Sequence, residues 1–284
     1  MGRVYFGLVR VHVVSDVHGT ADALALAGGA DMLICLGDLL LFLDYEDPGQ
    51  GIYAELYGAD YTREYIALRT AKRFDEARRL TARLTAERGD QAKGDPASPA
   101  AQSQTARPRN LRALAEGLVR RQYKELFEAL PEPAYLTYGN VDVPELWQEN
   151  LKPGHHVIDG GRVEVGGYAF GFAGAGLVSP YRTPNEIPEA DFAAKLNAIV
   201  ADGPVDVLCT HIPPAVPELL YDTVARRLET GSGALLEVIR QIQPRYAIFG
   251  HVHQPLARRV RIGRTECVNV GHFRATRVPF IVDL

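Results

Sequence analysis

The sequence is poor in cysteine, has no long apolar run and carries no strong excess of charge. Cys35, Cys209 and Cys267 lie in apolar segments without metal-type spacing, and their odd number argues against a disulfide framework. No run reaches the roughly eighteen apolar residues of a membrane span. The first apolar stretch is broken by Arg10 and His12 and lacks a cleavage signal, so no signal peptide is expected. These absences predict a cytoplasmic protein with buried thiols.

The charge balance excludes a global basic field. The 284 residues carry 31 lysines and arginines against 35 aspartates and glutamates, a formal net charge of −4. This balance argues against stable nucleic-acid binding, although it permits a local basic groove. Hydrophobic residues make up 46% of the chain, which is enough to fill the core of one enzyme-sized domain over residues 1–284.

The first forty residues have the pattern of strand, helix and strand. The apolar, β-branched run that begins at Val11 indicates a buried parallel strand that ends at Asp16, so that its end presents Asp16 and His18. An Ala-rich helix over residues 20–27 and a second strand over residues 31–36 follow, and the second strand ends at Gly37 and Asp38. Such a unit is parallel and right-handed, and the carboxyl ends of its strands form the edge where open α/β sheets bind ligands.

Residues 44–133 have the pattern of a helical insertion. Residues 60–88 suit one or two amphipathic helices, residues 111–130 another, and residues 89–110 lack hydrophobic periodicity and indicate a mobile linker. Long insertions of this kind are often functional. Two roles stay open: a lid over a site, or a contact between two copies of the chain.

The rest of the chain alternates between strands and helices. Strands are expected over residues 134–138, 205–210 and 245–249, and helices over 189–201, 217–228 and 233–242. Short antiparallel strands are expected over 156–159, 162–165 and 168–173, and a β tail over 256–262, 265–270 and 278–282. The predicted architecture is two sheets with helices outside them.

Five predicted strand ends carry groups that bind metals. In chain order these groups are Asp16 and His18, then Asp38, then Asn140 and Asp142, then His211, then His251 and His253. Taken singly, each has an ordinary explanation as a helix cap, a turn residue or a solvated side chain. Together they predict one cluster at one edge of one sheet.

Oxygen donors mixed with neutral imidazoles suit manganese, iron or zinc rather than calcium. More than six donors exceed the needs of one ion, and two ions about 3.5 to 4 Å apart can clamp an in-line displacement at phosphorus. The pattern therefore indicates phosphoester hydrolysis.

The chain resembles the calcineurin-like metallophosphoesterases. The resemblance rests on five blocks in the family's order: Asp16-Val17-His18-Gly19, Gly37-Asp38, Gly139-Asn140-Val141-Asp142, Thr210-His211 and Gly250-His251-Val252-His253. It spans most of the chain except the insertion. The fold it implies is an α/β four-layer sandwich of two mixed β-sheets flanked by helices.

The resemblance also implies roles for these side chains and a cofactor of two divalent transition metal ions, manganese first, with iron or zinc as alternatives. The first ion would be held by Asp16, His18 and His253. The second would be held by Asn140, His211 and His251, and Asp38 would bridge the two. A substrate phosphate would lie between the ions, in contact with Asn140, and a metal-bound hydroxide would attack it.

Val141 is the main departure from the family pattern, which has Gly-Asn-His-Asp or Gly-Asn-His-Glu at this block. Loss of a general acid costs roughly a hundredfold to ten-thousandfold on a poor leaving group. Some bacterial and archaeal phosphodiesterases of the family also lack this histidine, so the departure favours a phosphodiesterase over a protein phosphatase. Asp142, counted among the catalytic residues, has lost its usual partner and is expected to structure the loop instead.

His272 and Arg274 are candidates to take over from the missing histidine. They lie in Asn269-Val270-Gly271-His272-Phe273-Arg274, where relatives often have a turn near the site. One of them would contact the phosphate or the leaving group. The alternative is an ordinary surface turn between strands.

Three functions therefore stand beside one another. The leading one is a metal-dependent phosphoesterase, more a phosphodiesterase than a protein phosphatase, acting on a small phosphoester that is either a nucleotide or a phosphodiester. The second is a non-catalytic protein-binding scaffold on the same fold, which the complete ligand set opposes because buried carboxylates are costly without cations. The third is a nuclease that grips phosphates with arginines of the insertion, which neighbouring acidic residues largely neutralise. Those arginines are Arg63, Arg69, Arg73, Arg78, Arg79, Arg83 and Arg88.

Overall fold

The computed structural model describes residues 7–91 and 111–284 of the chain. The predicted linker over residues 89–110 lies outside the described residues from residue 92 onward. The described residues form two compact units. The sheet unit runs up to Leu40 and resumes at Tyr123, and the helical unit lies between Leu41 and Gln122.

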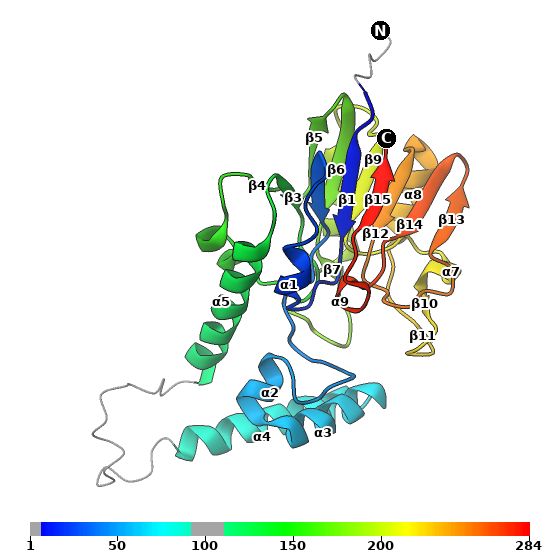
Figure 1. The fold of residues 1–284 in the computed structure, drawn as a ribbon. Helices are drawn as coiled ribbons and strands as arrows, with labels where there is room; N and C mark the ends of the chain where they lie inside the picture. Colours follow the sequence, from blue (N-terminus) through cyan, green and yellow to red (C-terminus); the bar gives the residue numbers. More distant parts are fainter. Residues whose placement is uncertain (1–6, 92–110) are drawn as a thin grey trace. The chain divides into compact units, whose positions relative to one another are not determined.

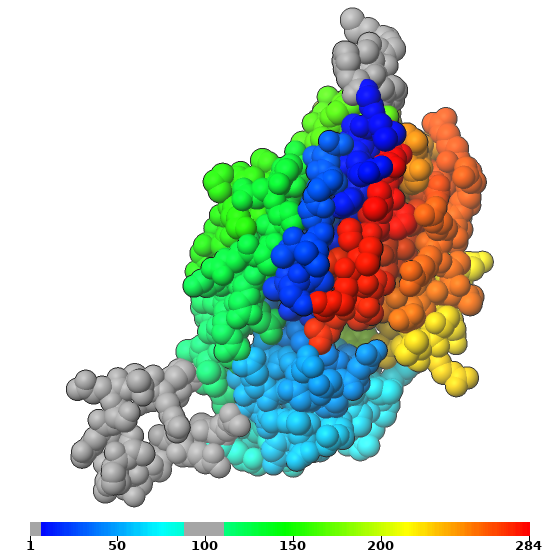
Figure 2. Space-filling view, in the orientation of Figure 1, coloured from blue at the N-terminus to red at the C-terminus, as the bar shows by residue number. Residues whose placement is uncertain are grey.

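The sheet unit contains a five-stranded sheet in the order β15-β1-β2-β3-β4 (Figure 1). Its strands are β1 (Arg10–Val14), β2 (Met32–Cys35), β3 (Ala134–Leu136), β4 (His155–Val157) and β15 (Phe280–Asp283). β1 to β4 are parallel, which confirms the predicted unit of β1, the short helix α1 (Ala21–Leu24) and β2. β15 pairs with β1 in the antiparallel direction, and in Figure 2 these two segments, blue and red, lie side by side.

A six-stranded sheet in the order β13-β14-β12-β9-β6-β5 forms the second half of the sandwich. Its strands are β5 (Gly161–Val165), β6 (Tyr168–Ala173), β9 (Val207–Thr210), β12 (Tyr246–Phe249), β13 (Arg259–Ile262) and β14 (Thr265–Asn269). The four inner strands are parallel, and β5 and β13 are antiparallel edges.

The antiparallel pairing predicted for residues 156–173 is correct for β5 and β6 and wrong for β4. β4 instead joins the first sheet, parallel to β3. The free edge of β3 offers backbone groups that β4 satisfies, and Ile158 N continues the pairing to Leu136 O at 2.8 Å. The chain then crosses to the second sheet.

The main core lies between the two sheets. Val11 and Ile34 of the first sheet pack with Phe170, Phe172 and Val207 of the second. The side chains alternate along β1, so His12 faces the other side, where its Nδ1 lies 2.8 Å from the carbonyl oxygen of Ala27 after α1.

Helices cover the outer faces of both sheets. The far face of the second sheet packs on α6 (Glu189–Val200) and α8 (Gly233–Ile242) through Phe192, Leu196 and Leu235. The predicted four-layer sandwich of two mixed sheets flanked by helices is thereby confirmed. The three cysteines are free and buried, as the sequence predicted.

Short elements complete the sheet unit. They are β7 (Gly176–Leu177), β8 (Glu186–Ile187), α7 (Pro217–Leu220), β10 (Tyr221–Asp222), β11 (Arg227–Leu228), α9 (Phe273–Thr276) and the 3₁₀ turns η2 (Pro144–Leu146) and η3 (Gln148–Asn150). The helix predicted over residues 217–228 is wrong beyond Leu220. Asp222 Oδ1 accepts the N–H groups of Val224 and Ala225, which turns the chain and allows β10 and β11 to pair as a hairpin.

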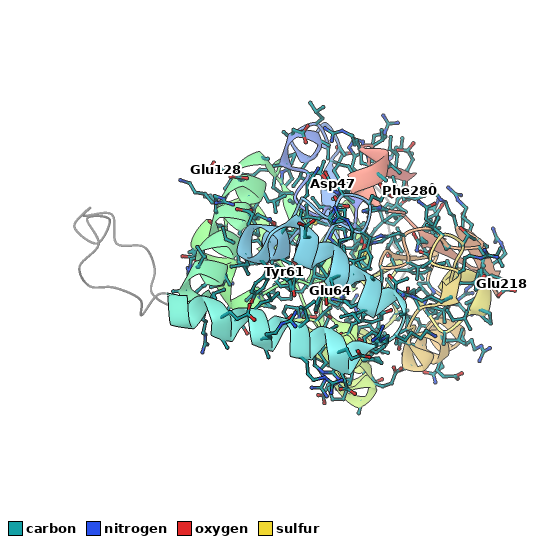
Figure 3. All side chains as sticks on the ribbon, turned by 90° about the horizontal axis from the view of Figure 1, so that it is seen from below. Asp47, Tyr61, Glu64, Glu128, Glu218 and Phe280 are labelled. Carbon is teal, nitrogen blue, oxygen red and sulfur yellow. The ribbon has the colours of Figure 1, made fainter. Side chains whose placement is uncertain are left out.

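The helical unit contains α2 (Ile52–Tyr57), α3 (Ala59–Thr70), α4 (Phe74–Gln91) and the first part of α5 (Leu111–Ala129). Residues 60–88 thus form two helices, and α4 continues past the predicted start of the linker. Most of α3 is solvated; Figure 3 labels two of its side chains, Tyr61 and Glu64. No helix in the described part of the chain is long and apolar enough to cross a membrane.

Candidate metal centre

The donor groups predicted from the sequence come together at the carboxyl ends of five strands. Asp16 and His18 follow β1, Asp38 follows β2, Asn140 follows β3, His211 follows β9, and His251 and His253 follow β12. The expectation that all five ends share one sheet is wrong. β1, β2 and β3 belong to the first sheet, and β9 and β12 belong to the second. The packing of one sheet on the other brings the two sets of ends to one place.

The loops that carry these groups have unusual backbones. Asp16, His18, Asp38 and His251 have positive φ angles of 56°, 42°, 53° and 67°. Aspartate and histidine tolerate this left-handed region better than most residues, yet each such position still costs about 1–3 kcal/mol. Four strained positions among seven predicted ligands make these loops a candidate functional site, because strain of this kind is concentrated at such sites.

Close backbone packing holds two of the loops together. Gly37 has φ 93°, and a Cβ built on it would lie 1.9 Å from Gly139 N. A Cβ on Gly139 would lie 2.0 Å from Asp38 Oδ1. The glycines of the Gly-Asp and Gly-Asn blocks are therefore required by the close approach of the two loops.

Three donors form what we call the first cluster. Its members are Asp16 Oδ1, His18 Nε2 and His253 Nε2. His253 Nε2 lies 3.3 Å from His18 Nε2 and 3.4 Å from Asp16 Oδ1, and His18 Nε2 lies 4.0 Å from Asp16 Oδ1. Asp16 Oδ2 accepts the backbone N–H of His251 at 2.9 Å, whereas Oδ1 is buried and accepts no hydrogen bond within the described part of the chain. Ligands of a tetrahedral ion with bonds of about 2.0–2.1 Å lie about 3.3 Å apart, which matches the two separations from His253 Nε2; the 4.0 Å between His18 Nε2 and Asp16 Oδ1 is longer.

Three further donors form the second cluster. Asn140 Oδ1 lies 2.9 Å from His211 Nε2 and 3.0 Å from His251 Nδ1. Asp38 reaches both clusters, because its Oδ1 lies 3.5 Å from His211 Nε2 and its Oδ2 lies 4.0 Å from His18 Nε2. The two oxygens of Asp38 thus point one to each cluster.

Backbone carbonyls fix the histidine tautomers. His18 Nδ1 lies 2.9 Å from Leu40 O, and His211 Nδ1 lies 3.0 Å from Leu36 O. A carbonyl oxygen only accepts, so each Nδ1 carries the proton and each Nε2 presents a bare lone pair to its cluster. Burial lowers the pKa of His211, and it lowers the pKa of His18 to about 4, so both rings stay neutral at neutral pH.

A chain of hydrogen bonds fixes the orientation of the Asn140 amide, so that its oxygen faces the second cluster. The carboxylate of Glu186 accepts the Thr183 hydroxyl at 2.7 Å, and Thr183 Oγ1 must therefore accept from Asn140 Nδ2 at 3.2 Å. The amide oxygen then faces His211 Nε2, and two lone pairs meet at 2.9 Å. Two acceptors at this distance repel unless a cation lies beside both of them.

The two buried carboxylates of the clusters differ in how well their negative charges are balanced. Burial alone would raise the pKa of Asp16, but the imidazole of His253, whose Nε2 lies 3.4 Å from Asp16 Oδ1, holds it well below its usual range. Burial and the charges of Asp16 and Asp142 raise the pKa of Asp38 well above its usual range. Divalent ions reverse such a shift, because their own charge dominates the site. The donors therefore fit bound metal ions by both geometry and charge.

Asp142 lies behind this centre. It is buried, its Oδ2 accepts the N–H groups of Asp38 and Gly139 at 2.8 Å, and its Oδ1 accepts the N–H of Leu39 at 3.0 Å. Burial raises the pKa of Asp142 to about 6. Its position is that of a residue that joins two loops, and direct participation in chemistry stays a prediction. Val141 contributes its backbone N–H to Asp38 Oδ1 at 2.9 Å, a contact that needs no particular side chain.

The two candidates of the 269–274 segment have different positions. The His272 ring stacks on His253, with ring centroids 3.9 Å apart and an interplanar angle of 11°. Arg274 Nη1 donates to the backbone oxygen of His18 at 2.9 Å, so the guanidinium supports a ligand loop. Contact of Arg274 with a phosphate stays a prediction.

Sequence reasoning did not find Thr183 and Glu186. Both belong to a polar segment between β7 and the end of β8, and neither their type nor their spacing separates them from ordinary loop residues. Their importance follows only from the fold, which places Thr183 beside Asn140. A carboxylate with four hydrogen bonds from Ser179 and Thr183 is the structural signal.

No family model matches the chain, and no curated protein matches it in sequence. Eighteen chains of solved structures are similar to it in fold. One is TT1561 of Thermus thermophilus, which is 14% identical, with a TM-score of 0.50 over 98% of this chain and 99% of that one. Another is a candidate 5′-nucleotidase from Staphylococcus aureus in complex with α-ketoglutarate. It is 13% identical, with a TM-score of 0.45 over 93% of this chain and 49% of that one. At these identities, the likeness to TT1561 establishes the fold alone.

Proposed function

We propose that the protein is a metal-dependent phosphoester hydrolase with a binuclear centre. The observation that carries the proposal is the arrangement of lone pairs. Asn140 Oδ1 faces His211 Nε2 at 2.9 Å, and the two oxygens of Asp38 point one to each cluster. One cation would explain the first cluster, and a second would explain the repulsion in the second cluster.

The ions would be held as the family resemblance implies. Asp16, His18 and His253 would bind the first ion, Asn140, His211 and His251 the second, and Asp38 both. Two ions so held would activate water and neutralise charge on a phosphoryl group. Manganese is the first choice, with iron and zinc as alternatives.

The chain's own side chains limit the substrate. Val141 offers no proton to a leaving group, and Asp142 is occupied by backbone N–H groups. We therefore expect the enzyme to favour esters whose leaving group departs without a proton, either because it is a weak base or because a metal ion stabilises its negative charge. We propose a small phosphoester as substrate, either a nucleotide or a phosphodiester, rather than a phosphoprotein.

Hydrolysis of bis(p-nitrophenyl) phosphate by the full-length chain, freed of metal and reloaded with Mn²⁺, tests the proposal. Turnover should require the metal and should fall by more than about a hundredfold in Asp38→Asn, since this variant changes the charge shared by both clusters. Asp22→Asn, an exposed carboxylate of α1, is the matched control and should keep full turnover. No hydrolysis of either diesters or monoesters with any divalent metal would overturn the proposal.

The two alternatives predict other results. A scaffold would purify without metal, whereas the enzyme should carry about two transition-metal ions per chain. A nuclease would show salt-sensitive binding to single-stranded DNA. Against the nuclease, Arg63, Arg73 and Arg78 form ion pairs with the acidic residues three positions away. The role of the helical unit as a lid or as a contact between copies stays a prediction, and sedimentation of the full-length chain would test the second.

A further inference from the structure

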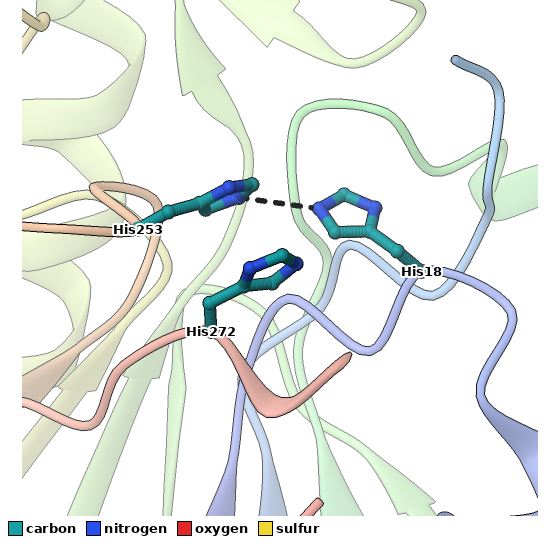
Figure 4. A group of neighbouring side chains, drawn as sticks. All are labelled: His18, His253 and His272. Atoms are coloured by element: carbon teal, nitrogen blue, oxygen red, sulfur yellow. Dashed lines mark hydrogen bonds between the residues drawn. The ribbon is translucent and has the colours of Figure 1, made fainter. Parts of the chain in front are cut away.

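A third imidazole lies beside the first cluster. The donor nitrogens of His18, His253 and His272 lie within 4.8 Å of one another (Figure 4). The His272 ring stacks on His253 and meets His18 edge to face, with ring centroids 5.6 Å apart. His272 Nε2 is buried and has no hydrogen-bond partner among the residues that the structure describes. A buried, unpaired ring nitrogen that faces two other imidazoles requires an explanation.

The segment that carries His272 is fixed to the loop of the first cluster. Phe273 N donates to Ser15 O at 3.0 Å, and Arg274 N donates to Asp16 O at 3.2 Å. The Arg274 guanidinium adds its hydrogen bond to His18 O at 2.9 Å. These three bonds hold the start of α9 against the backbone that presents Asp16 and His18.

The same segment is fixed on its other side to the loop of His253. Asn269 Nδ2 donates to Gly250 O at 3.1 Å and to Val252 O at 3.0 Å, and Asn269 Oδ1 accepts the N–H of Gly271 at 2.8 Å. Asn269 is buried. The segment that carries His272 is therefore hydrogen-bonded through Asn269, Phe273 and Arg274 to both loops that supply the first cluster. An ordinary surface turn would not need such bonds, whereas the position of a metal ligand depends on them.

We propose that His272 is a further ligand of the ion held by the first cluster, an inference that rests on the proposed function. The buried position of Nε2 favours this role over protonation of a leaving group, because a general acid must be reached by substrate. The ion would then have three imidazoles beside the oxygens of Asp16 and Asp38. The second ion would have two imidazoles, the amide oxygen of Asn140 and the other oxygen of Asp38. The first position, with three imidazoles, should therefore hold borderline metals such as Zn²⁺ or Co²⁺ more tightly.

Cobalt binding to the full-length, metal-free chain tests the proposal. His272→Phe keeps a ring that can stack on His253 and removes the donor, and His156→Phe, an exposed histidine of β4, is the matched control. The wild type and the control should bind two Co²⁺ ions. His272→Phe should bind one of the two ions more than about 10-fold more weakly. Loss of a residue that only hydrogen-bonds to a metal ligand already costs about 10-fold in affinity, so loss of a ligand itself should cost more. Its paramagnetic NMR spectrum should lack one shifted imidazole N–H signal.

The alternative outcomes are distinct. Unchanged cobalt affinity and an unchanged number of shifted signals in His272→Phe would overturn the proposal. Unchanged cobalt binding with a selective loss of turnover on diesters with poor leaving groups would also overturn it, in favour of an acid role. Circular dichroism of the metal-free variant establishes whether it folds, and His272→Gln repeats the test with a smaller side chain. A wild-type chain that binds no cobalt would instead count against the proposed function.

Discussion

The loops that carry the seven candidate metal ligands and the helical unit use polar side chains in opposite ways. In the loops, buried carboxylates accept backbone N–H groups, and glycines allow backbones to touch. In the helical unit, charged side chains pair on the surface at helical spacing, as Arg73 and Glu76 do with 56% and 41% of their side chains exposed. Surface pairs contribute little to stability, whereas buried contacts of backbone with carboxylate contribute much. The same substitution should therefore have different effects in the two regions.

The largest difference is expected for glycine with positive φ. Gly37→Ala places a Cβ 1.9 Å from a backbone nitrogen, which neither loop can accommodate, and we expect a loss of about 4 kcal/mol or more in the free energy of unfolding. Gly58→Ala, between α2 and α3, has a similar φ of 90° but no atom within 4 Å of the added Cβ, so only the backbone strain of about 1–3 kcal/mol remains.

Urea unfolding in EDTA measures both glycine variants without a contribution from metal. Insolubility of Gly37→Ala, with a soluble Gly58→Ala, would agree with the expectation. Equal losses in the two variants would show that the close approach of Gly37 and Gly139 is not what constrains these loops.

The second-largest difference in the free energy of unfolding is expected between a buried and an exposed carboxylate. Asp142→Asn should lower the free energy of unfolding by about 2–3 kcal/mol. Both oxygens of Asp142 accept N–H groups, so the amide must turn its own NH₂ toward a donor in either orientation. Asp47→Asn in the helical unit, an exposed residue, should change it by less than about 0.5 kcal/mol.

The Asp142 comparison also uses denaturation in EDTA. A loss in Asp142→Asn no larger than that in Asp47→Asn would remove the role of Asp142 in joining the two loops. Direct participation of Asp142 in chemistry would then be the better interpretation.

A smaller effect is expected for the hydroxyl that orients Asn140. Thr183→Val removes the acceptor of Asn140 Nδ2 and leaves the shape nearly unchanged. The amide can then rotate, and we expect the weaker of the two Mn²⁺ affinities to fall about 10-fold, or about 1.4 kcal/mol. Thr81→Val in the helical unit removes a hydroxyl bonded to Tyr53 at 2.9 Å and should leave both affinities unchanged. Calorimetric titration of Mn²⁺ distinguishes the cases, and equal affinities in all three proteins would contradict the orienting role.

The same comparison explains how far the sequence could predict this molecule. The strand ends were predictable because apolar runs stop at aspartate and histidine residues, such as Asp16 and His18, which together suit few roles other than metal binding. The pairing of β4 with β3 was not predictable, since it depends on which strand, distant in sequence, has a free edge in the folded chain. Thr183 and Glu186 were not, because ordinary residue types acquire their role only beside Asn140. Helical periodicity predicted α3, α4 and α5 well, yet these helices present no group of side chains that indicates a function.

The smallest effect, and one of opposite sign, is expected for the glycine inside α5. Gly117 lies at an exposed helical position with nothing within 4 Å of an added Cβ. Alanine loses less backbone entropy there, so Gly117→Ala should stabilise the helix by about 0.5–1 kcal/mol. Thermal unfolding followed by circular dichroism should show a higher midpoint without a change in metal affinity. A lower midpoint would mean that Gly117 makes a close contact in solution, and that its position on α5 is constrained by packing as the loop glycines are.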